Sequence, residues 1–536
     1  MLNSILNLLD NYSCFIVKNG DEFLSEYPQD NLNRLSRLLG FTGSNGMAIF
    51  YLNKDKMQQI FLTDSRYILQ AKDELKDFEI YDIQNKSLTQ LLQEAYIKNI
   101  IINTKICSLA FCQKLKDLDF NILHNTIDEE LLQIDYSNIS GEAIIFDKEE
   151  LVFGVAKDQK LKLLAKYIKD KKCDAIFLSD PIDVNYILNI RGKDFASVPI
   201  KACFATIKSD GDYMLFENND LYNFSSFIKL SDRLIVSNAA SQYCFDLLDK
   251  CCNVILVADR FVECMRAVKN KTEIENFTKI CLQDSKVLNQ FIKTWLIDNK
   301  NIDQESETSL SEQLFKMRSS QSNFVCNSFD TISAFGANGA IVHYKPSKAS
   351  DTKITGDGLY LLDSGGHYFY GTTDVTRTVL VGKAKKEWVT NFTLVLKGHI
   401  AIASLVFPDG LSGSDIDILA RQHLWSQGLD YGHGTGHGVG YLLSVHEGPC
   451  GISRYNRTAF KEGMVVSNEP GFYKQGEYGI RIENLLLVQK SQKYQNFLEF
   501  KTLTFVALDE RLVDKSMLTS QELDWFNNYQ ELSFVL

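Results

Sequence analysis

Long apolar runs, basic clusters and cysteines at metal-ligand spacing are all missing from this sequence of 536 residues. No stretch approaches the roughly 18 uninterrupted apolar residues of a membrane-spanning helix, so we expect no membrane partner. The net charge is -11 and the pI is near 5.4, which argues against nucleic acid as a partner, because phosphate binding needs a basic face. The densest basic group near the candidate site, residues 383–386, is typical of a solvated turn.

The 12 cysteines have neither paired metal spacing nor the density of a secreted, disulfide-rich scaffold. Most are therefore expected to be reduced and buried. The adjacent Cys251 and Cys252, and the spacing of Cys107 and Cys112, leave redox chemistry open as an alternative to simple packing. Residues 1–10 carry no basic region and no small-residue cleavage site, so we expect no secretory signal and a cytoplasmic location.

The composition is that of a globular protein, with 45% hydrophobic and 23% charged residues. The length exceeds one ordinary core, and the pattern predicts three domains. We place an α/β domain at residues 1–152, a second at 153–262, and a third at 263–536 with a tail from about 492.

Short apolar runs alternate with helical patterns through the first two predicted domains, which indicates α/β layering. The order of strand, charged turn and strand in Ala48–Tyr67 recurs in Ala202–Tyr222. Internal duplication explains this weak echo, and convergent patterning explains it nearly as well. From Glu273 to Leu296 the pattern is an amphipathic helix, and a strand-rich region follows.

Four acidic residues lie in strand-like sequence in the last third of the chain. Asp363 ends the run Leu359–Leu362, and Asp374 opens a second run, which predicts a hairpin with the two carboxylates opposite each other. Glu469 follows a strand and precedes a Pro-Gly turn, and Glu483 shares one strand face with Arg481. Buried carboxylates without partners cost several kcal/mol each, so these four need cations.

Arg481 supplies one positive charge, which leaves most of the negative charge uncompensated. Two divalent ions would balance it, with His437 as a neutral fifth ligand, in a two-metal site that holds a bridging hydroxide. The oxygen-rich ligand set favours Mn²⁺, although Zn²⁺ or Co²⁺ also fits. His433 and His437 have the spacing of a helical zinc pair, but the four glycines from Gly434 to Gly440 favour a loop.

The chain resembles the Xaa-Pro aminopeptidases (aminopeptidase P), and specifically their long, three-domain cytosolic form, over nearly its whole length. Six motifs carry the resemblance, in the order found in that family: Leu362 to Gly366, Gly371 to Thr378, His433 to Gly440, Val445 to Pro449, Asn468 to Gly471, and Gly479 to Asn484.

The resemblance implies a fold class of mixed α/β and α+β type. Two creatinase-type α/β domains precede a catalytic domain of the pita-bread fold, a curved antiparallel sheet with outer helices. It also implies that one metal is held by Asp363, Asp374 and Glu483, and the other by Asp374, His437, Glu469 and Glu483.

The resemblance further implies an activity. The enzyme would hydrolyse the bond between the N-terminal residue of a peptide and a penultimate proline, by attack of a metal-bridging hydroxide. His446 would bind the developing oxyanion, His343 and His433 would orient the substrate, and Glu469 would shuttle a proton. Arg481 would brace the acids, with a plain ion pair on the strand face as the alternative. A homodimer is expected from the family.

Two features depart from the family pattern. Residues 345–350 replace a Pro-x-Pro-Glu stretch, and Asn468 replaces a commoner aspartate; neither is a predicted metal ligand. The remaining histidines of this region, His367, His399 and His423, match no catalytic position and are expected to be structural. Two other functions stay open: a prolidase, which takes only dipeptides, and a pita-bread protein that binds without catalysis.

Overall fold

The computed structural model describes residues 2–54, 56–137, 139–347 and 350–535. They form two compact units. The first contains residues 1–145, 155–196 and 200–262, and the second contains residues 146–154, 197–199 and 263–536. The division into three domains stays a prediction, although the first unit holds two separate sheets.

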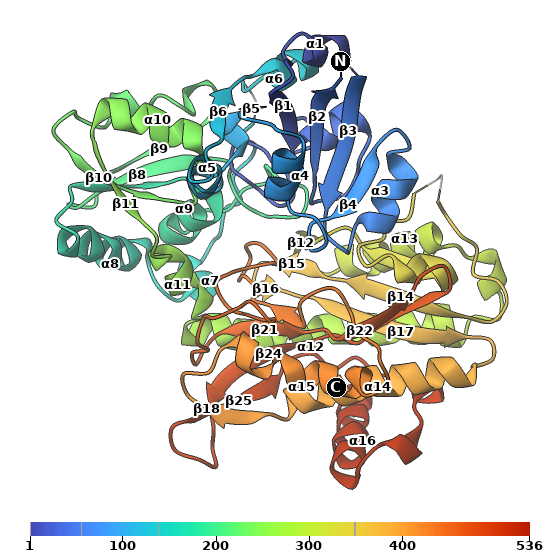
Figure 1. The fold of residues 1–536 in the computed structure, drawn as a ribbon. Coiled ribbons are helices and arrows are strands. Elements are labelled where there is room, and N and C mark those ends of the chain that lie inside the picture. The colour runs from blue at the N-terminus through green and yellow to red at the C-terminus, as the bar shows by residue number, and fades with distance from the viewer. Residues whose placement is uncertain (1, 55, 138, 348–349, 536) are drawn as a thin grey trace. The chain divides into compact units, whose positions relative to one another are not determined.

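The first sheet has six strands in the order β4-β3-β2-β1-β5-β6 (Figure 1). Strand β1 pairs antiparallel with β2 and parallel with β5. The bounds are β1 Ser13–Lys18, β2 Met47–Asn53, β3 Lys56–Thr63, β4 Glu79–Asp82, β5 Asn99–Ile102 and β6 Asn121–His124.

This sheet is buried on both faces because its central strands are apolar at successive positions. Cys14 and Ile16 pack on one face with α4 and α5, while Phe15 and Val17 pack on the other with α1, α2 and α3. The helices are α1 Leu2–Leu6, α2 Arg34–Leu39, α3 Ile68–Glu74, α4 Leu88–Glu94, α5 Leu109–Lys116 and α6 Ile127–Leu132.

The second sheet repeats this topology. Its order is β11-β10-β7-β8-β9, with β7 antiparallel to β8 and parallel to β10, as β1 is to β2 and β5. The shared topology supports duplication as the source of the echo in the sequence. The elements are α8 Lys157–Asp170, β7 Ala175–Leu178, α9 Pro181–Leu188, β8 Phe204–Lys208, β9 Tyr213–Phe216, β10 Arg233–Ser237, α10 Gln242–Cys251, β11 Asn253–Val257 and α11 Phe261–Ala267.

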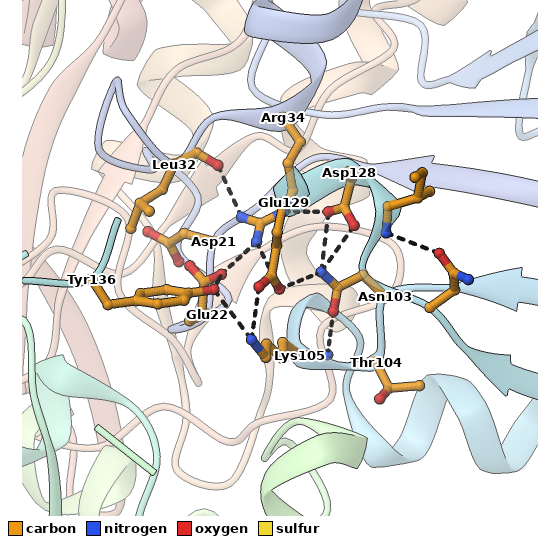
Figure 2. Close-up of polar contacts among 12 residues, drawn as sticks. Asp21, Glu22, Leu32, Arg34, Asn103, Thr104, Lys105, Asp128, Glu129 and Tyr136 are labelled. Carbon is orange, nitrogen blue, oxygen red and sulfur yellow. Dashed lines mark hydrogen bonds and ion pairs between the residues drawn. The ribbon is translucent and has the colours of Figure 1, made fainter. Parts of the chain in front are cut away.

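A buried network of charges surrounds Arg34 in the first unit (Figure 2). Arg34 Nε lies 2.7 Å from Asp128 Oδ2, and its Nη2 contacts Glu22 Oε1. Lys105 Nζ lies 2.8 Å from Glu129 Oε2. Removing one partner of such a pair leaves a buried charge uncompensated, which is strongly destabilising.

The second unit is built from short antiparallel sheets flanked by helices (Figure 1). Two of these sheets, β13-β14-β17 and β18-β25-β24-β21, carry strands that matter for the candidate site. The strands are β12 Phe324–Asn327, β13 Ile332–Phe335, β14 Gly358–Ser364, β15 Gly366–Tyr368, β16 Gly371–Thr372, β17 Val375–Val381, β18 Val406–Pro408, β19 Gly436–His437, β20 Gly451–Ile452, β21 Val465–Asn468, β22 Gly471–Lys474, β23 Tyr478–Arg481, β24 Asn484–Lys490 and β25 Phe497–Thr502.

The helices of this unit pack their apolar sides on the strands, and α14 lies along α15. A capping box of Asn270 and Glu273 begins α12, which ends at Phe291, so the helix expected to reach Leu296 continues there as a π-helical turn. The α-helices are α7 Glu149–Phe153, α12 Lys271–Phe291, α13 Glu307–Ser319, α14 Lys386–Ala403, α15 Gly413–Trp425 and α16 Ser520–Val535.

None of the helices in the described ranges combines the length and apolarity that a bilayer crossing requires. None of the cysteines forms a disulfide, and nine of the 12 are buried, as the packing interpretation predicts.

Candidate metal centre

Two neighbouring strands carry the first pair of predicted ligands. Asp363 is the penultimate residue of β14, and Asp374 immediately precedes β17. The hairpin is confirmed, but its register places Thr376 opposite Asp363, so Asp374 is not the cross-strand partner. Alternation still puts Asp374 and Thr376 on one face, and the carboxylate of Asp374 is close enough to shift the pKa of Asp363.

The other three predicted ligands come from short segments beside β21 and β24. Glu469 directly follows β21, as expected. Glu483 was predicted inside a continuous strand, but Ile482 and Glu483 separate β23 from β24. His437 belongs to a short extended segment, β19, which confirms that the region from His433 to Gly440 is not a helix.

The glycines beside His437 are required for packing against the protein backbone. A Cβ on Gly436 would lie 1.9 Å from the carbonyl oxygen of Ser467, and one on Gly438 would lie 2.1 Å from that of Glu447. The loop therefore lies directly on β21, and this close approach brings His437 to the acids.

The structure brings the ligand atoms of Asp374, His437 and Glu483 to within 4.8 Å of one another. His437 Nε2 lies 3.3 Å from Asp374 Oδ2 and 3.4 Å from Glu469 Oε1. Asp363 joins the group through its electrostatic coupling with Asp374 and Glu469. All five predicted ligands thus converge from strands and loops that are distant in sequence.

Burial and mutual repulsion shift the proton affinities of the acids. Burial raises the pKa of Asp363 to about 6; Arg481 opposes that rise and Asp374 adds to it. Burial and the charges of Asp374 and Asp363 raise the pKa of Glu483 well above its usual value. Two acids that resist ionisation in one cluster indicate a deficit of positive charge.

The raised pKa of His437 also indicates a deficit of positive charge in the cluster. Burial alone would lower its pKa, but the hydrogen bond to Asp374 and the charge of Glu469 raise it to about 9. A cation at this place would take over from the proton, because a metal binds only the neutral imidazole.

The donor set therefore fits two divalent cations. Asp363 Oδ1 is buried and accepts no hydrogen bond within the described part of the chain. Four carboxylates and one imidazole make an oxygen-rich donor set of the kind that two-metal hydrolases use.

Arg481 extends from β23 to the acids and makes three contacts there. Its Nη2 lies 2.5 Å from Asp363 Oδ2, its Nε donates to Thr376 Oγ1 at 3.0 Å, and its Nη1 donates to Tyr473 OH at 2.7 Å. The side chain of Arg481 is only 2% exposed, so its charge is only weakly screened by water.

His433 is linked to Arg481 through Tyr473. His433 Nδ1 donates to the carbonyl of Gly434 at 2.7 Å. The other ring nitrogen, Nε2, therefore accepts a hydrogen bond from the Tyr473 hydroxyl at 2.8 Å. Burial lowers the pKa of His433 to about 4, which keeps the ring neutral at pH 7. His433 also lies 4.0 Å from Glu469 Oε2.

The other two predicted histidines lie on separate segments. The His446 ring packs edge-on against His437, with ring centroids 4.3 Å apart. His343 is partly buried in the segment between residues 340 and 358. Its neighbour Tyr344 donates to Glu307 Oε2 at 2.7 Å, which anchors this segment to the start of α13. Of the departing residues 345–350, positions 348 and 349 lie outside the described residues.

Sequence reasoning missed two residues that support the acids. Thr376 donates to Glu483 Oε2 at 2.7 Å, and Tyr473 links Arg481 to His433. His399, expected to be structural, contacts Asn468 O at 3.1 Å and Asn484 Nδ2 at 3.1 Å, so it joins the residues beside Glu469 and Glu483. The signals for Thr376 were its place in the motif from Gly371 to Thr378 and the alternation that puts it on one face with Asp374.

Models of known families match most of the chain. Residues 275–490 match the model of metallopeptidase family M24, and residues 496–532 match the C-terminal region of that peptidase family. Residues 28–127 and 140–229 each match a Creatinase/Prolidase N-terminal domain.

Curated relatives match over nearly the full length. Xaa-Pro aminopeptidase 1 of Dictyostelium discoideum is 31% identical over 96% of this chain and 89% of its own length. Xaa-Pro aminopeptidase app-1 of Caenorhabditis elegans is 33% identical over 96% of this chain and 90% of its own length.

Solved structures give the same result for the fold. The X-prolyl aminopeptidase of Caenorhabditis elegans, described as a cytosolic enzyme with a di-nuclear active site, superposes with a TM-score of 0.89 at 30% identity. It covers 97% of this chain and 91% of its own. The prolidase of Pyrococcus horikoshii covers only 65% of this chain, with a TM-score of 0.54 at 23% identity, which shows a shared fold alone.

Proposed function

This chain belongs to the Xaa-Pro aminopeptidases of metallopeptidase family M24, and from that premise we propose that it removes the first residue of peptides whose second residue is proline. It is a hydrolase, and the predicted fold of two creatinase-type domains and a pita-bread catalytic domain is confirmed. The observation that carries the proposal is the convergence of Asp374, His437 and Glu483 beside two further acids.

Asp363, Asp374 and Glu483 would hold one divalent ion, and Asp374, His437, Glu469 and Glu483 the other. When bound, two such ions acidify a water molecule and polarise the scissile carbonyl. The oxygen-rich ligands favour Mn²⁺, with Zn²⁺ or Co²⁺ as the alternatives.

Around these ligands, the chain's own residues would move protons and orient the peptide. Glu469, whose Oε1 accepts from Ser467 Oγ at 3.0 Å, would take a proton from the attacking water and pass it to the leaving proline nitrogen. His446, beside His437, would donate to the developing oxyanion. Both roles require these side chains to face the peptide as it reacts.

His343 and His433 would orient the peptide, and Arg481 would hold Asp363 in place.

An Xaa-Pro bond has no N–H, so a peptidase that binds this donor fails on it. The proposed site needs no donor from the scissile bond, which is consistent with proline at the second position.

The working state of the protein is also a proposal. We propose a homodimer in the cytoplasm, in keeping with the family and with the cytosolic relative of known structure. Sedimentation of the purified chain and fractionation of its source cells test these two points.

The main experiment compares Arg-Pro-Pro, Arg-Ala-Ala and the dipeptide Arg-Pro as substrates. Metal-stripped protein is assayed after return of Mn²⁺, Zn²⁺ or buffer alone. We expect arginine release from Arg-Pro-Pro with Mn²⁺, no release from Arg-Ala-Ala, and no release from the Asp374→Asn variant with any substrate.

The other outcomes contradict the proposal in distinguishable ways. Cleavage of Arg-Pro alone would make the protein a prolidase. Cleavage of Arg-Ala-Ala at a similar rate would remove the proline specificity. Folded protein that is silent with every metal would identify a binding protein that retains the fold.

A further inference from the structure

A buried ion pair lies behind the loop that joins the two aspartate ligands. Asp284, on α12, and Arg318, near the end of α13, are both fully buried. Arg318 Nε lies 2.8 Å from Asp284 Oδ1, and Nη2 lies 2.9 Å from Oδ2, so the pair is bidentate. Neither residue belongs to a motif that the sequence indicated as functional.

The carboxylate of Asp284 also binds the loop between β14 and β17. Tyr368 OH donates to Oδ1 at 2.7 Å, and Thr373 Oγ1 donates to Oδ2 at 2.8 Å. Together with Arg318, four donors therefore surround one buried carboxylate. A buried charge with this number of hydrogen bonds is held in one orientation.

Both arms of the loop are attached to this pair next to a predicted ligand. Arg318 Nη2 donates to the carbonyl of Ser364, the residue after Asp363, at 3.3 Å. Thr373, which donates to Asp284, is the residue before Asp374. The pair thus holds one arm through its arginine and the other through its aspartate.

The two arms lie unusually close at this point. The pairing of β14 with β17 ends at Ser364 and Val375. Beyond it, a Cβ on Gly365 would lie 1.9 Å from the carbonyl oxygen of Thr373, so only glycine fits. A small movement of either arm would therefore change the separation of the Asp363 and Asp374 carboxylates.

We infer that Asp284, held by Arg318, is a positioning residue of the metal centre, which fixes the separation of Asp363 and Asp374 without touching an ion or the peptide. The inference rests on the proposed function only for the assignment of these two aspartates as metal ligands. A bidentate buried pair is a costly way to stabilise a fold, since an apolar pair of similar volume often serves as well. The cost of this pair is explained if the pair fixes the positions of the two aspartate ligands.

The test uses Thr373, because its hydroxyl attaches the loop to Asp284. Thr373→Val keeps the shape of the side chain but removes both the donor to Asp284 and the acceptor of the Gly366 N–H, which lies 3.0 Å away. Thr373→Ser keeps both contacts, and Asp284→Asn leaves the Gly366 contact intact. We expect Mn²⁺ affinity, measured by calorimetric titration of the metal-stripped full chain, to fall about 10- to 100-fold in Thr373→Val and to stay near wild type in Thr373→Ser. Asp284→Asn should resemble Thr373→Val.

Asp128→Asn, in the buried Arg34 pair of the first unit, is the matched control. It removes a comparable charge far from the loop in sequence and should lower the melting temperature while leaving Mn²⁺ affinity unchanged. If Asp284→Asn does not fold, the two Thr373 variants decide the matter.

Two results would overturn the inference: a Mn²⁺ affinity of Thr373→Val within twofold of wild type, or a wild-type protein that binds no divalent ion. A wild type that binds two ions but cleaves no Xaa-Pro peptide would refute the proposed function and leave the positioning role intact, because the titration does not depend on catalysis.

Discussion

Thr376 and Glu483 are joined by a hydrogen bond of 2.7 Å, from the threonine Oγ1 to the carboxylate Oε2. The same hydroxyl accepts from Arg481 Nε at 3.0 Å. One threonine therefore connects a predicted ligand to the only guanidinium that contacts Asp363 among the described residues. The acids and their counter-charge are held as one assembly.

Removing this hydroxyl should weaken the metal centre. In Thr376→Val the shape of the side chain remains, but Glu483 Oε2 loses its donor and Arg481 Nε loses its acceptor. We expect Mn²⁺ affinity and kcat/KM to fall about 10- to 100-fold, as is usual when a residue that orients a ligand is lost. Thr376→Ser keeps the hydroxyl and should restore most of both; equal losses in the two variants would refute the role of the hydrogen bond.

Replacing Arg481 should be more damaging. Arg481→Met leaves the buried Asp363 without its counter-charge and Tyr473 without a donor. We expect kcat/KM to fall by on the order of 10²-fold, and Arg481→Lys to recover only part, because lysine cannot make the same forked contacts. Steady-state kinetics on Arg-Pro-Pro measure the effect. The exposed Arg457→Met is the control, and similar losses in both variants would contradict the prediction.

Tyr473 and His433 should act as a unit. Tyr473→Phe removes the hydroxyl that donates a hydrogen bond to His433 Nε2, and His433→Ala removes the acceptor of that bond. If the link matters for catalysis, the two effects on kcat/KM will not add, and the coupling energy will lie between about 0.5 and 3 kcal/mol. A double-mutant cycle measures it. Additive effects would show that each residue acts independently.

Removal of metal should destabilise the second unit. Ions that bind only the folded state add about 4 kcal/mol to the free energy of unfolding when present at 1,000 times their Kd. We expect calorimetric melting in EDTA to occur at a lower temperature than in Mn²⁺. The Asp374→Asn variant should respond much less, and an equal response would locate the effect elsewhere.

Asp21, which is drawn with the buried network in Figure 2, should make the stability of the first unit depend on pH. Burial raises the pKa of Asp21 from 3.8 to about 6. The folded protein therefore binds this proton more tightly than the unfolded chain, and the resulting stability is complete below pH 3.8 and is lost as the pH rises through 6.

Asp21→Asn removes this titration and keeps an Oδ1 acceptor for the backbone N–H groups of Phe23 and Ser25. From pH 7.5 to pH 5, the wild type should gain roughly 1 to 2 kcal/mol of unfolding free energy relative to the variant. Guanidinium unfolding of the full chain at both pH values measures the difference. Asp210→Asn, an exposed control, should show no such change, and a gain of the opposite sign for Asp21→Asn would refute the assignment.

The sequence was sufficient to locate the candidate acids and some of the strands that carry them. The apolar run that ends at Asp363 marked β14 within about one residue of its bounds. Burial could be inferred for Asp363 and Glu483 because apolar residues surround them in the chain. The ligand set and the roles of the histidines stay predictions, to be tested by the experiments above.

The local sequence pattern did not predict strand bounds and register correctly where the chain leaves a regular strand. The break at Ile482 and Glu483 and the register that sets Thr376 opposite Asp363 are decided by pairing between segments, which period-two alternation cannot fix to the residue. The close approach of Gly436 and Gly438 to other backbone segments is likewise decided by tertiary packing, which a local pattern does not contain.

What the sequence by itself determined is the chemistry: four acids in apolar surroundings, a histidine among glycines, and hence a need for cations. Only the tertiary structure decided which side chains hold these acids in place. Thr376 and Glu483 are 107 residues apart, and Asp284 and Thr373 are 89 apart. Contacts at such separations form when the whole core packs, so no local periodicity in the chain announces them.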